Sequence, residues 1–488
     1  MKQLGIRELL SSRPAFEADV VMGMIAARVV APHTKLATTR WWHTRTLPED
    51  LHIGHATEAD LYKAMDWLLE HQDLIEKKLA ARHLKTGGLA LYDLSSSFFE
   101  GKTCSLAALG HNRDGKKNKR QVNYGLLADR RGCPVAVSVY KGNTNDAKTV
   151  KPLVERLRKD FALERVVLVG DRGMIGQALV EDLRKVQGLE WITALKSSQI
   201  RALVEGGALQ LGLFDEKNLF ELSHPDYPGE RLVACRNLEL GKLRGHKRQA
   251  LVGATVKDLE KLRAMVKSGK LRGAGKIGVR AGRVINKYKV AKHFELTIED
   301  DRFDFAPREE EIAAEAALDG LYVIRTSLSK QEMNAPDAVR SYKSLSEVER
   351  AFRSMKTVDL EVRPIHHHLA DRVRAHIFLC MLAYYVEWHM REAWRSILFA
   401  DEDLEAKATP DPVAPAKRSD EAEAKAENKK LPDGTPAHSF RTALETLSTI
   451  VRNTCRTPGA KNAPTFAVVT TPTAEQQRAM DLLVKINV

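Results

Sequence analysis

The stretch ERVVLVGDRGMIG (Glu164–Gly176) decides the fold that we expect of this chain. Four valine and leucine residues lead into Gly170 and then Asp171, so a buried strand ends on a carboxylate. A charge at the end of a buried strand costs solvation free energy. Gly170 and Gly173 leave room there for another backbone or for a substrate. Asp171 is therefore a candidate functional residue, and the structural alternative is an N-cap for the following helix.

The composition is that of a globular protein with an excess of positive charge. The chain has 488 residues, long enough for two or three domains, and 43% of them are hydrophobic. Lys and Arg outnumber Asp and Glu by 77 to 64, which gives a net charge of +13. Sixteen of the bases, against two acids, lie between Lys242 and Lys292. A basic excess concentrated in one segment favours a polyanionic partner, most simply nucleic acid.

Cysteine usage and hydropathy indicate the cellular setting. The five cysteines lie far apart and form no CxxC pair, so the sequence predicts neither a zinc ribbon nor a disulfide framework. The sequence contains no apolar run long enough to cross a bilayer, and its first residues lack the apolar segment of a signal peptide. We therefore expect a protein of the reducing cytoplasm with no membrane partner.

The order of the hydrophobic patterns predicts an α/β protein built around a mixed sheet. The first 88 residues have helical periodicity, with Thr57 placed to cap a helix. From residue 89 the pattern becomes β-β-β-α-β-α-β, which predicts a mixed sheet flanked by helices. The predicted divisions are an N-terminal helical domain for DNA binding or dimerisation (1–88), the first part of the core (89–199), a β-rich basic insertion (200–317), the second part of the core (318–400), a disordered linker (401–436) and a C-terminal helical tail (437–488).

A second carboxylate lies in another predicted strand. Asp93, in LALYDLSSS, can meet Asp171 if the two strands are neighbours. Two close carboxylates repel unless a cation separates them, and hard oxygen ligands favour Mg²⁺ or Mn²⁺. Glu349, in YKSLSEVERAFRSMK, is the best candidate for a third ligand, because bases at helical spacing follow it on the same helix face. Glu347, two residues away, is its rival.

These motifs together resemble those of DDE transposases of bacterial insertion sequences. The resemblance is to the superfamily with a β-rich insertion before the glutamate and a Tyr-x2-Arg-x3-Glu-x6-Lys signature. Tyr342, Glu349 and Lys356 occupy three of the four signature positions. YDLSSSFFEG and VLVGDRGM match the strands that carry the first and second aspartates. The resemblance covers roughly residues 1–400, and the order of the motifs together with the long insertion makes it specific.

The resemblance implies an RNase H-like core in which Asp93, Asp171 and Glu349 bind two Mg²⁺ (or Mn²⁺) ions. Water would cleave at the end of the element, and the released 3′-hydroxyl would then attack target DNA. The implied partners are double-stranded DNA, as terminal inverted repeats and as target, and a second copy of the chain in a synaptic homodimer. A bacterial cytoplasmic, nucleoid-associated location follows from the same resemblance.

Several groups of side chains are expected to contact DNA. By resemblance, Tyr342 and Lys356 would position phosphates. The arginine of the signature is replaced by Leu345 in this chain, so its phosphate contact would pass to Arg350 or Arg353. Two further clusters of bases are candidates for contact with the DNA backbone, with solvated loops as the alternative; they are Lys116, Lys117, Lys119 and Arg120, and Lys247 and Arg248.

The sequence leaves two other functions open: a catalytically inactive, transposase-derived DNA-binding protein, and an RNase H-like nuclease without strand transfer. A DNA hairpin intermediate is also open. Some relatives stack a flipped base on a tryptophan of the insertion, whereas this chain has no Trp between positions 192 and 387. Tyr227, Phe220 or Tyr288 would have to serve instead. The run His366–His368 is expected to be structural or to contact phosphate, because consecutive residues chelate a metal poorly.

Overall fold

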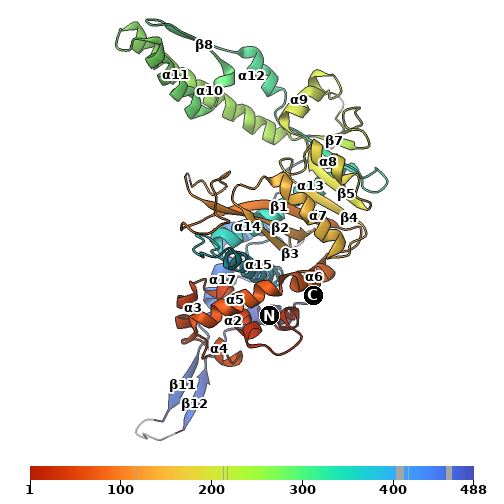
Figure 1. The fold of residues 1–488 in the computed structure, drawn as a ribbon, viewed down its shortest axis with the longest axis vertical. Helices are drawn as coiled ribbons and strands as arrows, with labels where there is room; N and C mark the ends of the chain where they lie inside the picture. Colours follow the sequence, from red (N-terminus) through yellow and green to blue (C-terminus); the bar gives the residue numbers. More distant parts are fainter. Residues whose placement is uncertain are drawn as a thin grey trace.

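An eight-stranded sheet crosses the middle of the molecule (Figure 1). The computed structural model describes residues 1–116, 118–210, 212, 214–216, 218–402, 411–415, 417–457 and 464–488. The order of the strands is β3-β2-β1-β4-β5-β10-β7-β6. Their bounds are β1 Leu89–Phe98, β2 Gln121–Asp129, β3 Pro134–Lys141, β4 Val166–Gly170, β5 Leu189–Ala194, β6 Leu219–Leu222, β7 Arg231–Arg236 and β10 Leu321–Thr326.

Strand β1 lies at the centre of the predicted core. It pairs antiparallel with β2 and parallel with β4, and β4 in turn pairs parallel with β5. Helix α7 (Val150–Lys159) precedes β4 and α8 (Gln177–Leu183) follows it, so the predicted β-β-β-α-β-α-β order is confirmed. All five residues of β4 are buried, as expected of a strand that is covered on both faces. The predicted fold class, an α/β protein built around a mixed sheet, is confirmed.

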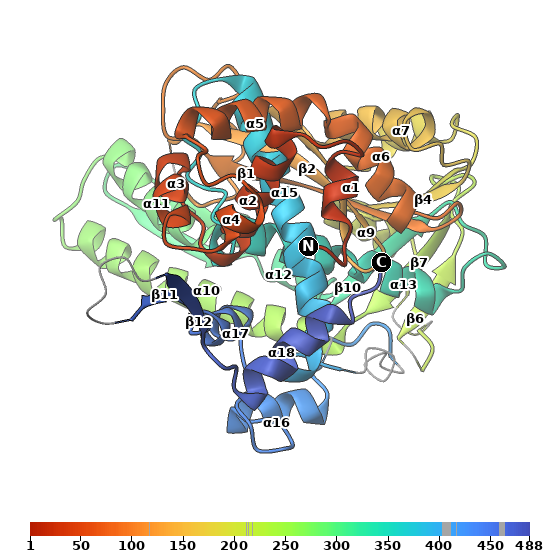
Figure 2. The same cartoon turned by 90° about the horizontal axis from the view of Figure 1, so that it is seen from below.

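Helix α15 (Ala370–Ala393) joins the sheet to the N-terminal helices. It packs against β3, α2 (Phe16–Val30) and α5 (Glu58–Glu70). Figure 2 shows the N-terminal helices lying across α15. Because these helices and the sheet share one hydrophobic core, the predicted boundary near residue 88 stays a prediction. The remaining N-terminal helices are α1 Ile6–Leu10, α3 Lys35–Trp42, α4 Leu47–Asp50 and α6 Gln72–His83.

Helix α5 begins where the sequence predicts. The Thr57 hydroxyl accepts a hydrogen bond from Asp60 N (3.4 Å), and the Asp60 carboxylate accepts one from Thr57 N (2.9 Å), which forms a capping box. Among the described residues, no single helix has the length and apolar character needed to cross a bilayer. Helices α2 and α3 meet that criterion only as a pair bent by 93°, and α2 is largely buried within the core.

The insertion contains more helix than the sequence predicts. Its strands β6 and β7 extend the main sheet, and β8 (Phe294–Ile298) pairs with β9 (Phe303–Pro307) in a separate hairpin. Its two longest elements, however, are α10 (Leu238–Lys267) and α11 (Ala274–Tyr288). These two helices pack on each other and project beyond the sheet (Figure 1). The shorter helices α9 (Ser197–Glu205) and α12 (Glu309–Ala316) complete the insertion.

A small core of its own stabilises the helical part of the insertion. Ile277 and Ala281 of α11 are fully buried against a cluster that includes Leu259, Leu262 and Phe294. Three glycines weaken the intrinsic helix propensity of α11. Burial of one apolar face outweighs that weakness and stabilises the helix.

The C-terminal region differs from the prediction as well. In the predicted linker, α16 (Asp420–Asn428) begins at Ser419, whose hydroxyl accepts a hydrogen bond from Ala422 N (3.2 Å). Lys425 is only 2% exposed and is paired with Glu402, so capping and ion pairing order this acidic segment. Residues 403–410 and 416 lie outside the described residues. The tail contains helices α17 (Phe440–Leu447) and α18 (Ala474–Val484), and also an unpredicted hairpin of β11 (Arg452–Arg456) and β12 (Thr465–Val469).

The junction between β10 and α10 tests this architecture. Gly320 has φ +77°, and an added Cβ would lie 2.2 Å from the Asn237 carbonyl oxygen. We expect Gly320→Ala to lower the free energy of unfolding by at least about 1 kcal/mol. The matched control is Gly253→Ala, at an exposed position of α10 with open space around it. It should stabilise by about 0.5–1 kcal/mol. Chemical denaturation measures both, and equal stability of the two variants would contradict the description of the junction.

Candidate active site

Strands β1 and β4 bring two carboxylates to the same edge of the sheet. Tyr92 is in register with Gly170 in the parallel pair, so Asp93 and Asp171, which come next on each strand, are neighbours. Both line an open cavity of about 920 Å³. The chain turns sharply after Asp171, and a Cβ at Gly170 would lie 2.9 Å from Ile175 Cδ1. A larger residue at position 170 would therefore have to displace the end of the Ile175 side chain.

Helix α14 (Leu345–Arg353) supplies the third carboxylate. It packs against β1 through its buried face. Glu349 is exposed on the face that lines the same cavity. Glu347 instead forms an ion pair with Arg350 (2.8 Å) and packs against Gly132 in the β2–β3 turn. The structure therefore places Glu349, and not its rival, beside the two aspartates.

None of these three carboxylates forms an ion pair within the described part of the chain. Burial and the negative charges of Asp171 and Glu349 together raise the pKa of Asp93 to about 6, against the opposing effects of the hydrogen bond from Leu94 N (2.7 Å) and of the Arg113 charge. The Tyr342 hydroxyl donates a hydrogen bond to Asp171 Oδ1 (3.2 Å). Hard oxygen ligands with uncompensated negative charge fit a divalent cation such as Mg²⁺ or Mn²⁺.

The other acids of the cavity are paired. Asp114 forms ion pairs with Lys356 (3.1 Å) and with Arg363. Asp146 accepts two hydrogen bonds from Arg113 Nη2 (2.7 and 2.6 Å). The sequence patterns did not single out Arg113, Asp114 or Arg363. No local signal distinguishes them, because each partner lies on a distant segment. Their pairing leaves the three predicted carboxylates as the ones in position to bind a cation.

The predicted phosphate contacts differ in their surroundings. Lys356 lines the cavity, but it is only 8% exposed and is paired with Asp114. Burial lowers the pKa of Lys356, and its ammonium supports the cavity wall. Arg353 lines the cavity, is exposed, and has no ion pair among the described residues. Leu345 is buried at the same cavity. Arg353 is therefore better placed than Arg350 to take over the contact of the missing signature arginine.

The first predicted basic cluster lies in the loop between β1 and β2. Lys119 forms an ion pair with Glu100 (2.8 Å), and Arg120 donates a hydrogen bond to a backbone carbonyl (3.0 Å). Lys116 is exposed. Lys117 lies outside the described residues. The role of this cluster in DNA binding stays a prediction, with Lys116 as its most available base.

The second predicted cluster is divided by the fold. Both Nη atoms of Arg248 donate to the Asp319 carboxylate, one of them at 3.0 Å, which ties α10 to the start of β10. Lys247 is exposed on α10. Arg248 therefore has a structural partner, while Lys247 can reach solvent.

The aromatic residues considered for base stacking are all partly or fully engaged. Tyr227 is 6% exposed and belongs to a core shared with the half-buried Phe220. Tyr288 donates a hydrogen bond to Asp258 (2.9 Å). In the histidine run, burial lowers the pKa of His367 to about 3. The stacking role of the aromatics stays untested, and the burial of His367 fits the expected structural role.

Comparison with known proteins adds independent information. A family model for the transposase DDE domain matches residues 102–386, more than half of the chain, and the match includes Asp171 and Glu349 but begins after Asp93. A structure of the piggyBac transposase synaptic complex with hairpin DNA is similar at 9% identity and TM-score 0.41, over 78% of this chain and 67% of that one. A structure of the Mos1 transposase paired-end complex with left transposon end is similar at 11% identity and TM-score 0.17, over 40% of this chain and 62% of that one. No curated protein matches.

Two neighbouring strands and one helix thus bring two aspartates and a glutamate together, and the family match spans most of that arrangement. Site and match define a DDE domain. The chain belongs to the transposase DDE domain family and is a DNA transposase.

Cation binding at this site should depend on pH. Because the pKa of Asp93 is raised to about 6, its ionised form is disfavoured in the fold, and protons compete with a cation at and below that pH. We expect Mg²⁺ or Mn²⁺ to raise the melting temperature clearly at about pH 8 and weakly at about pH 5. Asp93→Asn should remove most of the difference, whereas Asp50→Asn, at an exposed site on α4, should not. A cation effect that is independent of pH would contradict the site.

Proposed function

We propose that this transposase cleaves DNA at the ends of an insertion sequence and joins the released 3′-hydroxyl to target DNA, by a cut-and-paste route. One observation carries the proposal. Three acids from β1, β4 and α14 line one cavity, and none of them is ion-paired within the described residues. Two Mg²⁺ or Mn²⁺ ions held by these acids would activate the attacking oxygen and stabilise the leaving one.

The surrounding side chains have separate tasks in this proposal. The Tyr342 hydroxyl holds Asp171 in orientation through its hydrogen bond. Arg353 presents an unpaired guanidinium to the cavity, where it would bind a phosphate next to the scissile one. Lys356 and Arg363 keep Asp114 neutralised, so that this fourth acid does not compete for the cations. Every step transfers a phosphoryl group directly between oxygens, which requires no protein nucleophile.

Helix α11 provides a surface for the DNA backbone. Lys276, Arg280, Arg283 and Lys287 follow one another at helical spacing on one face, and all four are exposed. Lys287 is paired with Asp258 (3.2 Å), whereas the other three have no acidic partner among the described residues. A stripe of unpaired bases on a projecting helix is suited to a row of phosphates. We assign non-specific contact with DNA to this face.

The assembly and the setting are part of the same proposal. Transposition must hold two DNA ends together, so the active form would be a homodimer, and the substrate places it at the bacterial nucleoid. The net charge of +13 is compatible with an enzyme that works on a long polyanion.

The carboxylates provide the central test of catalysis. We expect Asp93→Asn, Asp171→Asn and Glu349→Gln each to lower end cleavage by roughly a thousandfold, because each removes a cation ligand worth several kcal/mol to the transition state. We expect each variant to bind DNA at least as tightly as the wild type, because replacing a carboxylate by an amide removes a negative charge that repels the phosphates. Gel assays of cleavage and joining measure the first effect, and filter binding measures the second.

Glu347→Gln is the matched control, because this neighbour faces the β2–β3 turn and should retain activity. Full activity of Asp171→Asn would refute the assignment. Cleavage without joined product in the wild type would favour the nuclease alternative, and wild-type binding without cleavage the inactive one.

The basic stripe predicts a change in salt dependence. Arg280→Gln combined with Arg283→Gln should weaken DNA binding equally for all sequences. The slope of log K against log salt should fall by about 0.9 for each lost phosphate contact. The control is Lys63→Gln with Lys77→Gln, two exposed bases on the N-terminal helices. If both pairs change the slope equally, the positive charge of the whole molecule, and not this helix, binds the DNA.

A further inference from the structure

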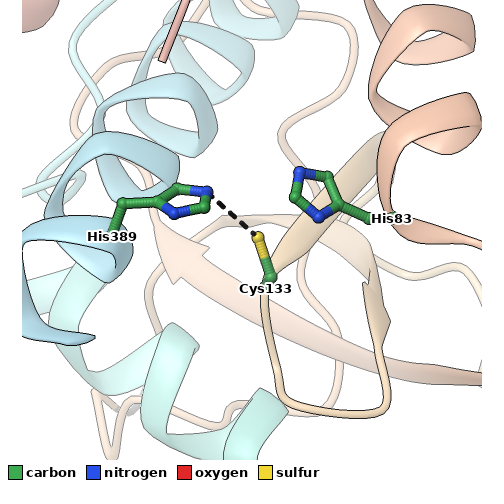
Figure 3. A group of neighbouring side chains, drawn as sticks. All are labelled: His83, Cys133 and His389. Carbon is green, nitrogen blue, oxygen red and sulfur yellow. Dashed lines mark hydrogen bonds between the residues drawn. The ribbon is translucent and has the colours of Figure 1, made fainter. Parts of the chain in front are cut away.

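A cluster of metal-binding side chain types lies away from the catalytic cavity. His83 ends α6, Cys133 lies in the turn between β2 and β3, and His389 belongs to α15. One potential ligand atom from each lies within 4.8 Å of the others. Figure 3 shows the two imidazole rings on either side of the Cys133 sulfur, and Cys133 Sγ is 3.8 Å from His389 Nε2.

We propose that His83, Cys133 and His389 bind a zinc ion or a similar thiophilic divalent metal. A thiolate and two imidazoles are typical zinc ligands, and bond lengths of about 2.0–2.3 Å place neighbouring ligand atoms between about 3 and 4 Å apart. The sulfur and His389 Nε2 already meet that separation. The His83 ring lies beside the same sulfur (Figure 3), and its ligand atom lies within 4.8 Å of the other two.

The surroundings keep the two histidines in the form that binds a metal, whereas burial raises the pKa of the Cys133 thiol, so that its proton would leave only as the metal binds. Burial lowers the pKa of His83 to about 4 and of His389 to about 3, so both imidazoles are neutral and have a lone pair to donate. His83 Nε2 is 3.0 Å from the Tyr385 hydroxyl oxygen, and Arg131 is 3.5 Å from His83 Nδ1. If His83 Nε2–H donates a hydrogen bond to the Tyr385 hydroxyl, the Nδ1 lone pair is left for a metal. Histidines that bind zinc commonly donate their other ring N–H to a neighbouring group in this way.

The cysteine is held in a rigid turn. Asp129 Oδ1 accepts hydrogen bonds from Cys133 N (3.0 Å) and Arg131 N (2.8 Å), and Asp129 also pairs with the Arg131 guanidinium (2.8 Å). Arg131 would give up only its long contact to His83 when a metal binds, because it keeps Asp129 and lies over the Trp388 ring (5.0 Å). The thiolate formed on binding offsets the positive charge that the ion brings.

A cavity of about 380 Å³ adjoins the two histidines. His83, Arg131, His389 and Glu392 line it, together with the last residues of the chain. Water from this cavity would complete the coordination of the ion, because both carboxylate oxygens of Glu392 are bound by Arg395. The metal would join three segments that are remote in sequence, and the site does not rest on the proposed catalytic function.

Cobalt provides a direct test, because a thiolate bound to Co²⁺ gives a charge-transfer absorption that oxygen ligands do not. The full chain is stripped with a chelator and titrated with Co²⁺ in excess Mg²⁺, which occupies the carboxylate site. We expect the thiolate band to saturate at one equivalent and Zn²⁺ to displace it. Cys133→Ser should abolish the band, and His389→Gln should weaken Co²⁺ binding by more than about tenfold. Cys235→Ser and Cys380→Ser, at buried thiols elsewhere, should leave it intact.

A second measurement needs no variant. Zn²⁺ should slow alkylation of Cys133 by about tenfold or more, read by peptide mass spectrometry, while the half-buried Cys455 reacts at an unchanged rate. The proposal is overturned if Co²⁺ gives no thiolate band with the wild type, if the band persists in folded Cys133→Ser, or if Zn²⁺ leaves the alkylation of Cys133 unchanged.

Discussion

The parallel pairing of β1 with β4 is the constraint on which the rest of the site depends. It sets Asp93 beside Asp171, where two charges about 4 Å apart would repel by about 4 kcal/mol at an effective dielectric constant of 20. Burial adds to the cost and raises the pKa of Asp93. The protein compensates each neighbouring acid of the cavity with an arginine or lysine and leaves these carboxylates without one. Such selective omission is expected where a cation, and not a side chain, is the intended partner.

The third carboxylate depends on packing across a long interval of sequence. Between β4 and α14 the chain completes the sheet and builds an insertion with its own hydrophobic core. That independent core explains how a large segment can project from the sheet without disturbing α14, whose buried face is fixed against β1. Helices α10 and α11 can therefore carry basic side chains at a distance from the sheet edge that holds the carboxylates. In the function that we propose, catalysis and contact with the DNA backbone would thereby lie on parts of the fold that are stabilised separately.

Local sequence patterns correctly predicted the elements whose formation depends mainly on residues close together in the chain. The valine-rich β4, the capping box at Thr57 and the placement of Asp171 after a buried strand all follow from short-range rules. Helix α11 did not, because its glycines disfavour a helix and only burial of Ile277 and Ala281 against α10 stabilises one. The burial of Lys356 could not be predicted from the sequence either. Its partner Asp114 lies 242 positions away, and no spacing rule connects the two.

The histidine–cysteine cluster shows why a search for short metal motifs misses such a site. Its members come from the N-terminal helices, the sheet and the long C-terminal helix, so only the folded chain brings them together. The position of Cys133 also links the cluster to catalysis. The preceding residue, Gly132, has φ +84° and packs so closely on Glu347 that an added Cβ would lie 2.6 Å from it. A metal that fixes this turn would fix the surface against which α14 rests, and through α14 the position of Glu349. A metal bound by the histidine–cysteine cluster would therefore help to hold Glu349 in position, although the two sites share no ligand.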